Sequence, residues 1–345
     1  MKLRRNLLTL AYAWLAGSGW AWAQEPPAPQ RVTFTTQDGV KIVGDFYDAG
    51  AGGDQKPAFV ILLHMYMKDR TSWAPLIPEL TRSRISVLAI DLRGHGESTE
   101  VVEVTPPADE EEAAQPPDEE RETEEETPKG PTGSDLVERV KARDKKVFKA
   151  MTEDVWSAYE WLAKSGKVDL ARFGLVGASV GCTVAMDYAS RDKSVDVVYC
   201  LSPGTKYMGL RSGPHIKKLA DQAVMLVSNP EERKESEELK KNDENAELNV
   251  TLGKNGERDL HGTDMLGKVE NLEAEMAGYL TGHLGSPSDP KEMVVGNIKT
   301  RVYFKPDMAQ AQKLPERVRR WFSSPEEAES RGMKPGGGLP PTPFD

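Results

Sequence analysis

Cysteine is scarce in this chain, which has only Cys182 and Cys200 among its 345 residues. Two cysteines cannot form the disulfide framework that holds many small exported domains together. Both lie in apolar runs, where a buried free thiol is common, so the sequence favours free thiols over a disulfide bond. Residues 286–345 contain no cysteine, which excludes a four-cysteine zinc site there.

An excess of basic charge is also missing. The chain has 45 Lys and Arg residues against 55 Asp and Glu residues, a formal net charge of −10. The stretch 101–130 alone holds twelve acidic and two basic residues, so the rest of the chain is close to neutral. We therefore expect no nucleic-acid partner, and the acidity says little about the substrate.

Long apolar runs are absent except at the N-terminus. Three basic residues among the first five precede an apolar run, which ends in Ala-Trp-Ala before Gln24. This pattern predicts a cleaved secretory signal peptide over residues 1–23 and export to a periplasm or beyond. An uncleaved membrane anchor is the alternative, but the run is short for a bilayer span and contains Gly-Ser-Gly. After cleavage we expect no stable membrane span.

The rest of the chain divides by composition. Residues 24–30 are a proline-rich linker, and residues 31–285 have the patterning of one large folded domain. Within it, residues 100–133 are rich in Pro, Ala and Glu and are expected to be a disordered acidic spacer. Residues 286–345 form a small C-terminal module with a disordered end. Its clearest signal is a helix that begins with Ser324 as N-cap and has Glu327 in a capping box.

Strand and helix patterns alternate through the large domain. Residues 31–42 read as a hairpin, and the continuous apolar runs 58–63 and 85–90 are typical of buried parallel strands. A helix is predicted over Ser72–Arg82, followed after the spacer by an amphipathic helix around Trp156. Four further strands are expected within residues 172–179, 195–203, 223–229 and 246–253. The sequence thus predicts an α/β fold, a mostly parallel sheet with helices on both faces and the hairpin antiparallel at one edge.

The stretch Gly177-Ala178-Ser179-Val180-Gly181 fits the pattern G-x-S-x-G. It lies between a buried strand and a helix, which is the context that a nucleophilic serine in this motif requires. The flanking glycines allow a sharp turn that presents the hydroxyl at the carboxyl edge of the sheet, where open α/β sheets bind ligands. Ser179 is therefore our candidate nucleophile, and a small residue filling a glycine-rich turn is the plainer alternative.

A serine nucleophile needs a histidine base and a third group that orients the base. In this arrangement the chain order is serine, acid, histidine. His261 follows the last strand of the large domain and precedes a helix, so it is the best candidate base, against a capping or surface role. The other histidines are His64, His95, His215 and His283.

The acid should follow the strand within residues 223–229. Glu231 and Glu232 lie there, and we favour Glu232, although a solvated pair at the start of a charged helix is a serious alternative. Asp243 lies further on, and Asp259 is too near His261 in sequence to be the usual partner.

An acyl-transfer site also needs two backbone donors for the oxyanion. One should be the N–H of Val180, directly after the nucleophile. The other should come from the loop after the strand 58–63, at Met65 or Tyr66. Side chains that are candidates for an apolar acyl pocket, or for the core, are Met65, Met67, Trp73 and Met208.

Together these residues resemble the α/β-hydrolase superfamily, and within it bacterial exported esterases of the dienelactone-hydrolase-like kind. The resemblance covers residues 31–285 apart from the acidic spacer and rests on "LLHMYM", "DLRGHGES", "GASVG" and "HGTDML", in the expected order. It implies a Ser179–acid–His261 triad, no cofactor, no metal, and hydrolysis of an ester or related acyl bond of a small molecule. Two departures are Met65, where the family often has glycine, and glutamate in place of the usual aspartate.

The tail is similar to the small zinc-binding domain of the Ada DNA-repair protein. Such domains hold zinc with four cysteines, and the tail has none, so we expect a degenerate packing module without metal or repair function.

The resulting hypothesis is an exported serine hydrolase, a carboxylesterase. A serine peptidase or thioesterase on the same fold stays open, as does a non-catalytic binding protein whose triad has decayed at the acid. The sequence specifies neither the acyl length nor an oligomeric state.

Overall fold

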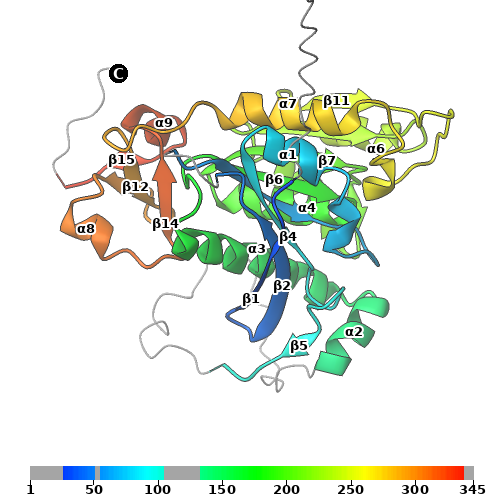
Figure 1. Ribbon diagram of the computed structural model, residues 1–345, viewed down its shortest axis with the longest axis horizontal. Helices are drawn as coiled ribbons and strands as arrows, with labels where there is room; N and C mark the ends of the chain where they lie inside the picture. The colour runs from blue at the N-terminus through cyan, green and yellow to red at the C-terminus, as the bar shows by residue number, and fades with distance from the viewer. Residues whose placement is uncertain (1–25, 51–54, 105–132, 338–345) are drawn as a thin grey trace, which may run out of the picture.

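The structure is a computed structural model that describes residues 26–50, 55–104 and 133–337 (Figure 1). The predicted signal peptide, most of the acidic spacer and the end of the tail lie outside the described residues.

The core of the large domain is a twisted sheet in the strand order β1-β2-β4-β3-β6-β7-β10-β11, with β5 paired to β2. Strands β4, β3, β6, β7, β10 and β11 are parallel to one another. The hairpin of β1 and β2 is antiparallel at one edge, as the sequence predicts. The strands are β1 Gln30–Thr35, β2 Val40–Tyr47, β3 Ala58–Leu63, β4 Ile85–Ile90, β5 Glu100–Val101, β6 Phe173–Ala178, β7 Val195–Leu201, β10 Ala223–Ser228 and β11 Glu247–Val250.

Helices cover both faces of this sheet, with α7 along the top and α3 below in Figure 1. Each face has its own apolar layer, because alternate side chains of buried strands point to opposite sides. One layer packs against α2 to α6, the other against α1 and α7. The helices are α1 Ile77–Arg82, α2 Gly133–Lys141, α3 Lys145–Ser165, α4 Val180–Arg191, α5 Gly213–Ile216, α6 Arg233–Lys240 and α7 Leu272–Leu284.

The prediction of a single helix over Ser72–Arg82 is wrong, because the structure has two separate helical segments there. A short 3₁₀ helix, Arg70–Trp73, is followed by a turn and then by α1 from Ile77. Pro75 has no N–H to donate and its ring clashes with the preceding turn, so a continuous helix cannot form across it. Pro78 is tolerated because it lies in the first turn of α1.

The predicted bounds of the disordered spacer, residues 100–133, include ordered residues at both ends. Glu100 and Val101 form β5, which pairs with Lys41 and Val40 at the end of the hairpin. The N–H of Val102 also donates to Gly39 O at 2.8 Å, which continues this contact. At the other end, α2 already begins at Gly133. The rest of the spacer lies outside the described residues.

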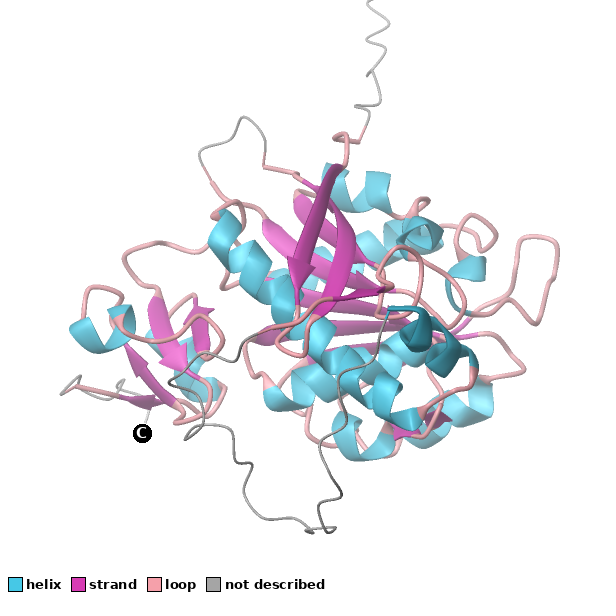
Figure 2. Ribbon diagram, turned by 90° about the horizontal axis from the view of Figure 1, so that it is seen from below, coloured by secondary structure: helices cyan, strands magenta, loops and turns pink. Residues whose placement is uncertain are grey.

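The C-terminal module is a small mixed sheet in the order β14-β12-β13-β15 with two short helices, and it stands beside the large sheet in Figure 2. The predicted helix is present as α9, and its cap is as expected, since Ser324 accepts from Glu327 N. Its elements are β12 Val294–Asn297, β13 Val302–Phe304, α8 Ala309–Gln312, β14 Arg319–Phe322, α9 Pro325–Ser330 and β15 Lys334–Pro335.

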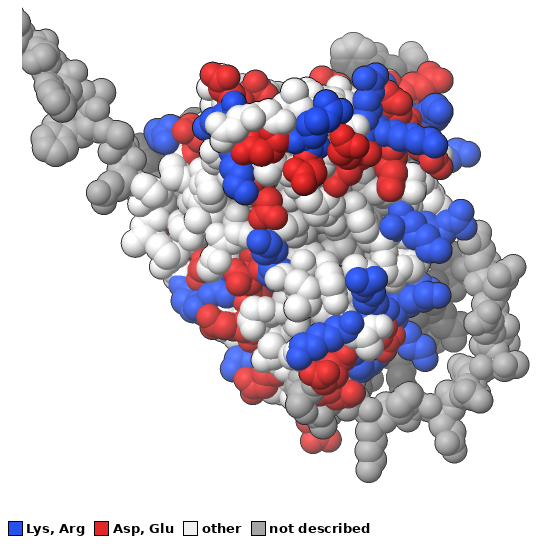
Figure 3. Space-filling view, turned by 90° about the vertical axis from the view of Figure 1, so that its right-hand side faces the viewer, with Lys and Arg blue, Asp and Glu red and all other residues white. Residues whose placement is uncertain are grey.

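Both cysteines are buried and free. Among the described residues, no helix is long and apolar enough to cross a membrane. On the face seen in Figure 3, acidic and basic side chains are interspersed and an uncharged band lies between them. This face therefore lacks the one-sided basic surface that nucleic-acid binding requires.

Candidate active site

Ser179 lies on a strained turn between β6 and α4. Its backbone has φ 53° and ψ −116°, a conformation that a residue with a Cβ rarely adopts. Its N–H donates to Leu201 O at 2.9 Å, which ties the turn to the end of β7. The turn places Ser179 at the carboxyl edge of the parallel sheet, as the motif predicts.

The two glycines of the motif are needed for close packing. A Cβ on Gly177 would lie 2.5 Å from the carbonyl carbon of Gly181, and one on Gly181 would lie 2.2 Å from Leu63 O. Real Cβ atoms cannot approach backbone so closely. The glycines therefore let α4 begin directly against the ends of β6 and β3.

The candidate acid and base come from two other strand ends and meet. His261 follows the loop after β11, and its Nδ1 is hydrogen-bonded to Glu232 Oε1. Glu231 is instead exposed and pairs with Arg258 at 3.0 Å. Of the two candidate acids, the structure thus brings only Glu232 to His261.

Two polar residues that the sequence analysis missed hold this pair in place. Asn229 donates from Nδ2 to Leu260 O at 2.9 Å and accepts from the N–H of Glu232 on Oδ1 at 2.9 Å. Ser202 Oγ accepts from the N–H of Gly262 at 2.9 Å. Each residue directly follows a buried strand. A polar side chain at the end of such a strand was the sequence feature that could have identified them. Together they tie the loops around His261 to the ends of β10 and β7.

The serine and the histidine are not hydrogen-bonded to each other in the structure. Tyr207 lies near Ser179, and its phenol donates to Ser202 O at 2.9 Å. Burial raises the pKa of Tyr207, and the nearby Ser179 side chain opposes that rise. Tyr207 lies on a small hairpin of β8 Lys206–Tyr207 and β9 Leu210–Arg211. Catalytic hydrogen bonds are often loose in a free enzyme and tighten on binding, so this geometry does not exclude the pair.

The candidate oxyanion donors flank the serine. The N–H of Val180 is at the first position of α4, where no intrahelical acceptor exists. Among the described residues, no hydrogen bond uses the N–H of Met65 or Tyr66. The loop that carries them is held by His64, whose Nδ1 contacts Met65 O at 2.8 Å and whose Nε2 accepts from Leu92 N at 2.9 Å. His64 therefore acts as a buried structural histidine.

This role of His64 predicts a pH dependence of stability. Burial, with the neighbouring His95 adding to it, lowers the pKa of His64 to about 3, whereas an unfolded chain holds histidine at about 6.5. Between these values the unfolded state binds more protons, so the free energy of unfolding should fall with falling pH, by up to about 1.4 kcal/mol per unit from this group. Urea unfolding from about pH 7 to about pH 4 measures this slope. We expect a smaller slope in His64→Gln, and equal slopes would contradict the assignment.

The candidate pocket side chains do not all face the site. Trp73 is completely buried in the layer under α1 and α7 and belongs to the core. Met65 is also buried and its Sδ packs against Gly262, beside His261. Met67 is exposed to 59%, and Met208 packs against the other layer. Of the four, Met65 is the one whose side chain extends from the candidate oxyanion loop to the loop that carries His261.

Groups for a metal are not assembled in the described part of the chain, where no three His, Cys, Asp or Glu side chains come together as ligands. The chemistry available at the site is that of a serine, an imidazole, a carboxylate and backbone N–H groups.

Comparisons with known proteins agree with the fold. A family model described as "alpha/beta hydrolase fold" matches residues 59–233, just over half of the chain. No curated protein sequence matches significantly. Similar solved structures include the esterase Pf2001 of Pyrococcus furiosus, at 19% identity over 74% of this chain and 93% of that one, with a TM-score of 0.50. The alpha/beta hydrolase GrgF of Penicillium sp. sh18 has 14% identity over 74% and 99%, with a TM-score of 0.50.

A dienelactone hydrolase from Anabaena variabilis also matches, at 16% identity over 74% of this chain and 97% of that one, with a TM-score of 0.46. Neither the family match, which ends at residue 233, nor these structures support the resemblance of the tail to an Ada-type zinc-binding domain. The predicted α/β-hydrolase fold is confirmed. With the sheet, the strained serine turn and the family match taken together, the chain belongs to the alpha/beta hydrolase fold family.

Proposed function

We propose that the protein is an exported serine hydrolase, a carboxylesterase that cleaves an ester or related acyl bond of a small molecule. The observation that carries the proposal is the His261–Glu232 pair, in a chain whose candidate serine lies on a strained strand-to-helix turn. The solved structures that share the fold include proteins described as an esterase and as hydrolases. Export is proposed from the N-terminal residues 1–23 alone.

In the proposed reaction Ser179 Oγ attacks the acyl carbon and His261 Nε2 accepts its proton. Glu232 keeps the proton of His261 on Nδ1 and stabilises the charged imidazole. The N–H of Val180 and that of Met65 or Tyr66 would donate to the oxyanion. His261 returns the proton to the leaving alcohol, and a water molecule then hydrolyses the acyl-enzyme.

One observation favours a second candidate, a non-catalytic binding protein on the same fold. His261 is hydrogen-bonded to Glu232 but not to the Ser179 hydroxyl, so in the free protein the serine is not engaged by the base. For catalysis the hydroxyl must form a hydrogen bond with His261 Nε2, a step that substrate binding can drive.

Turnover of a series of p-nitrophenyl esters, from acetate to longer acyl chains, separates the two candidates. The enzyme proposal expects saturable turnover with a preferred acyl length. Turnover no faster than that of a Ser179→Ala variant for every ester would leave only the binding protein.

A further inference from the structure

His261 lies at the end of a long connection. Residues 251–261 join β11 to a 3₁₀ helix, Gly262–Met265, and contain no helix or strand of their own. A loop of this kind keeps much of its conformational freedom unless other groups hold it. A catalytic base must lie within about 0.5 Å of its productive position. The alignment of His261 therefore depends on what fixes the chain on either side of it.

Asn229 fixes the residue before His261. Its side chain is 2% exposed, and it directly follows β10. Its Nδ2 donates to Leu260 O at 2.9 Å, and its Oδ1 accepts from the N–H of Glu232 at 2.9 Å. One amide group thus binds both the neighbour of the candidate base and the backbone of the candidate acid. The separation of His261 and Glu232 therefore depends on Asn229.

Ser202 fixes the residue after the candidate base. It is completely buried and directly follows β7, and its Oγ accepts from the N–H of Gly262 at 2.9 Å. Its backbone has φ 52°, in the region that favours glycine, and its N–H donates to Val227 O at 2.7 Å. Strained residues of this kind cluster at active sites, where the surrounding structure enforces them. The same strand end also holds the serine turn, since Leu201 O accepts from the N–H of Ser179.

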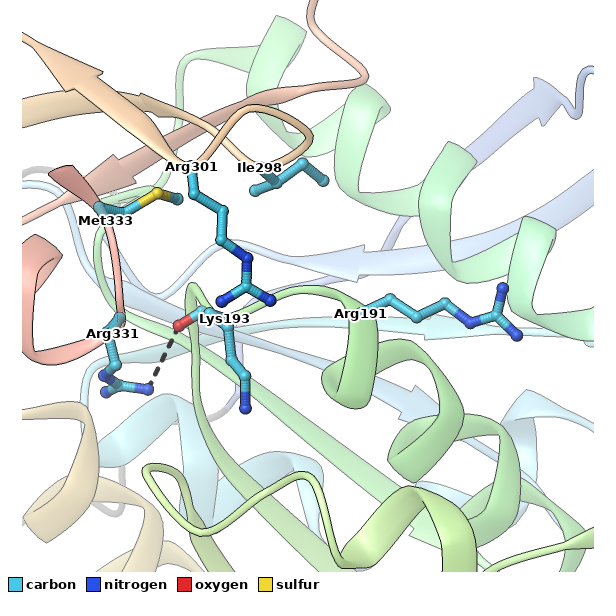
Figure 4. Close-up of a pocket in the computed structure, with 6 residues that line it drawn as sticks. All are labelled: Arg191, Lys193, Ile298, Arg301, Arg331 and Met333. Atoms are coloured by element: carbon cyan, nitrogen blue, oxygen red, sulfur yellow. Dashed lines mark hydrogen bonds between the residues drawn. The ribbon is translucent and has the colours of Figure 1, made fainter. Parts of the chain in front are cut away.

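The strands that carry these two residues are firmly held. β7 lies between β6 and β10, and β10 lies between β7 and β11. The amino end of β7 is also tied to the C-terminal module, because Arg331 Nη1 donates to Lys193 O at 3.4 Å and to Val195 O at 2.9 Å (Figure 4). Groups placed by strands are positioned more exactly than groups on loops. Ser202 and Asn229 are therefore fixed points to which the long connection is attached.

We propose that Asn229 and Ser202 are positioning residues for the candidate base. By holding the chain on both sides of His261, they keep its Nδ1 proton on Glu232 and leave Nε2 to accept the proton of Ser179. Both act through His261 and Glu232 and not on the reacting atoms. This inference deepens the proposed function and rests on it for the part that the pair plays in acyl transfer.

The tautomer of His261 tests the proposal without any substrate. The nitrogen NMR shifts of its imidazole, read through the carbon-bound ring protons of the isotope-labelled full chain, show which nitrogen carries the proton. His261→Gln assigns the signals, and alkaline buffer keeps the imidazole neutral. We expect the proton on Nδ1 in the wild type, and shifts averaged between the two tautomers in Asn229→Ala and in Ser202→Ala.

The matched control is Ser86→Ala. Ser86 is also completely buried, and its Oγ accepts from a backbone N–H, that of Ala49 at 3.0 Å, but it lies at the amino end of β4. It should keep the wild-type shifts. If Ser202→Ala does not fold, Ser202→Gly replaces it, because glycine adopts φ 52° without strain and also lacks the hydroxyl.

The ester assay gives the second readout. Asn229→Ala and Ser202→Ala should lower kcat by about 10- to 100-fold and leave KM within about twofold, because only the alignment of the base changes. Wild-type shifts in both variants, or averaged shifts in the wild type, overturn the proposal. A wild type without turnover, but with an Nδ1 proton that both variants lose, refutes the proposed function and supports the positioning role.

Discussion

Replacement of Ser179 by alanine is expected to lower kcat/KM for any ester that the protein turns over by about 10⁴- to 10⁶-fold. The reason is that the acyl-enzyme cannot form without the hydroxyl, so only oxyanion binding and positioning remain. Alanine keeps the Cβ of serine and meets the same strain at φ 53°, so we expect little change in stability. Initial rates on p-nitrophenyl esters measure the effect.

The matched control is Ser190→Ala. Ser190 lies on the same helix α4, and its hydroxyl donates to Asp187 O at 2.7 Å and contacts His215 Nδ1 at 3.4 Å, neither of which belongs to the candidate site. We expect wild-type rates from this variant. If Ser179→Ala turned over esters at the same rate as Ser190→Ala, hydrolysis would not depend on Ser179 and the proposed mechanism would be wrong.

The second large effect is expected from the paired variants Glu232→Gln and Glu231→Gln. Glutamine at position 232 keeps the shape of the side chain but cannot stabilise a charged imidazole or fix the proton on Nδ1 of His261. We therefore expect kcat to fall by about 10²- to 10⁴-fold. Glu231 pairs with the exposed Arg258, and its replacement should leave kcat within about twofold, since exposed ion pairs contribute little.

The comparison of the two glutamates is sharp because they are neighbours in sequence with the same chemistry. Their folded environments differ: one carboxylate lies against His261, and the other faces solvent. Equal activities of the two variants would show that the hydrogen bond to His261 has no catalytic role.

Much of the sheet could be predicted because strands buried on both faces are continuous apolar runs. The runs 58–63 and 85–90 are strands with those same bounds. Apolar spacing alone predicted one helix over Ser72–Arg82 and missed the break within it. Pro75 interrupts the backbone there, while the apolar pattern continues. Likewise, the short strand β5 has no pattern of its own and exists only because β2 offers it a partner.

The candidate site divides in the same way. Ser179 and His261 could be named from local motifs and chain order, and the choice of Glu232 rested on its place after a strand. The hydrogen bonds of Asn229 and Ser202 join loops that follow different strands. No local pattern specifies such contacts, since they depend on how the whole sheet brings its strand ends together.

Reaction with a serine-directed fluorophosphonate, followed by mass spectrometry of the peptides, tests the central claim most directly. The account predicts one adduct, on Ser179, that is absent from Ser179→Ala and forms more slowly in Glu232→Gln because His261 is then a poorer base. No adduct on the wild-type protein, or an adduct on a residue other than Ser179, would contradict it.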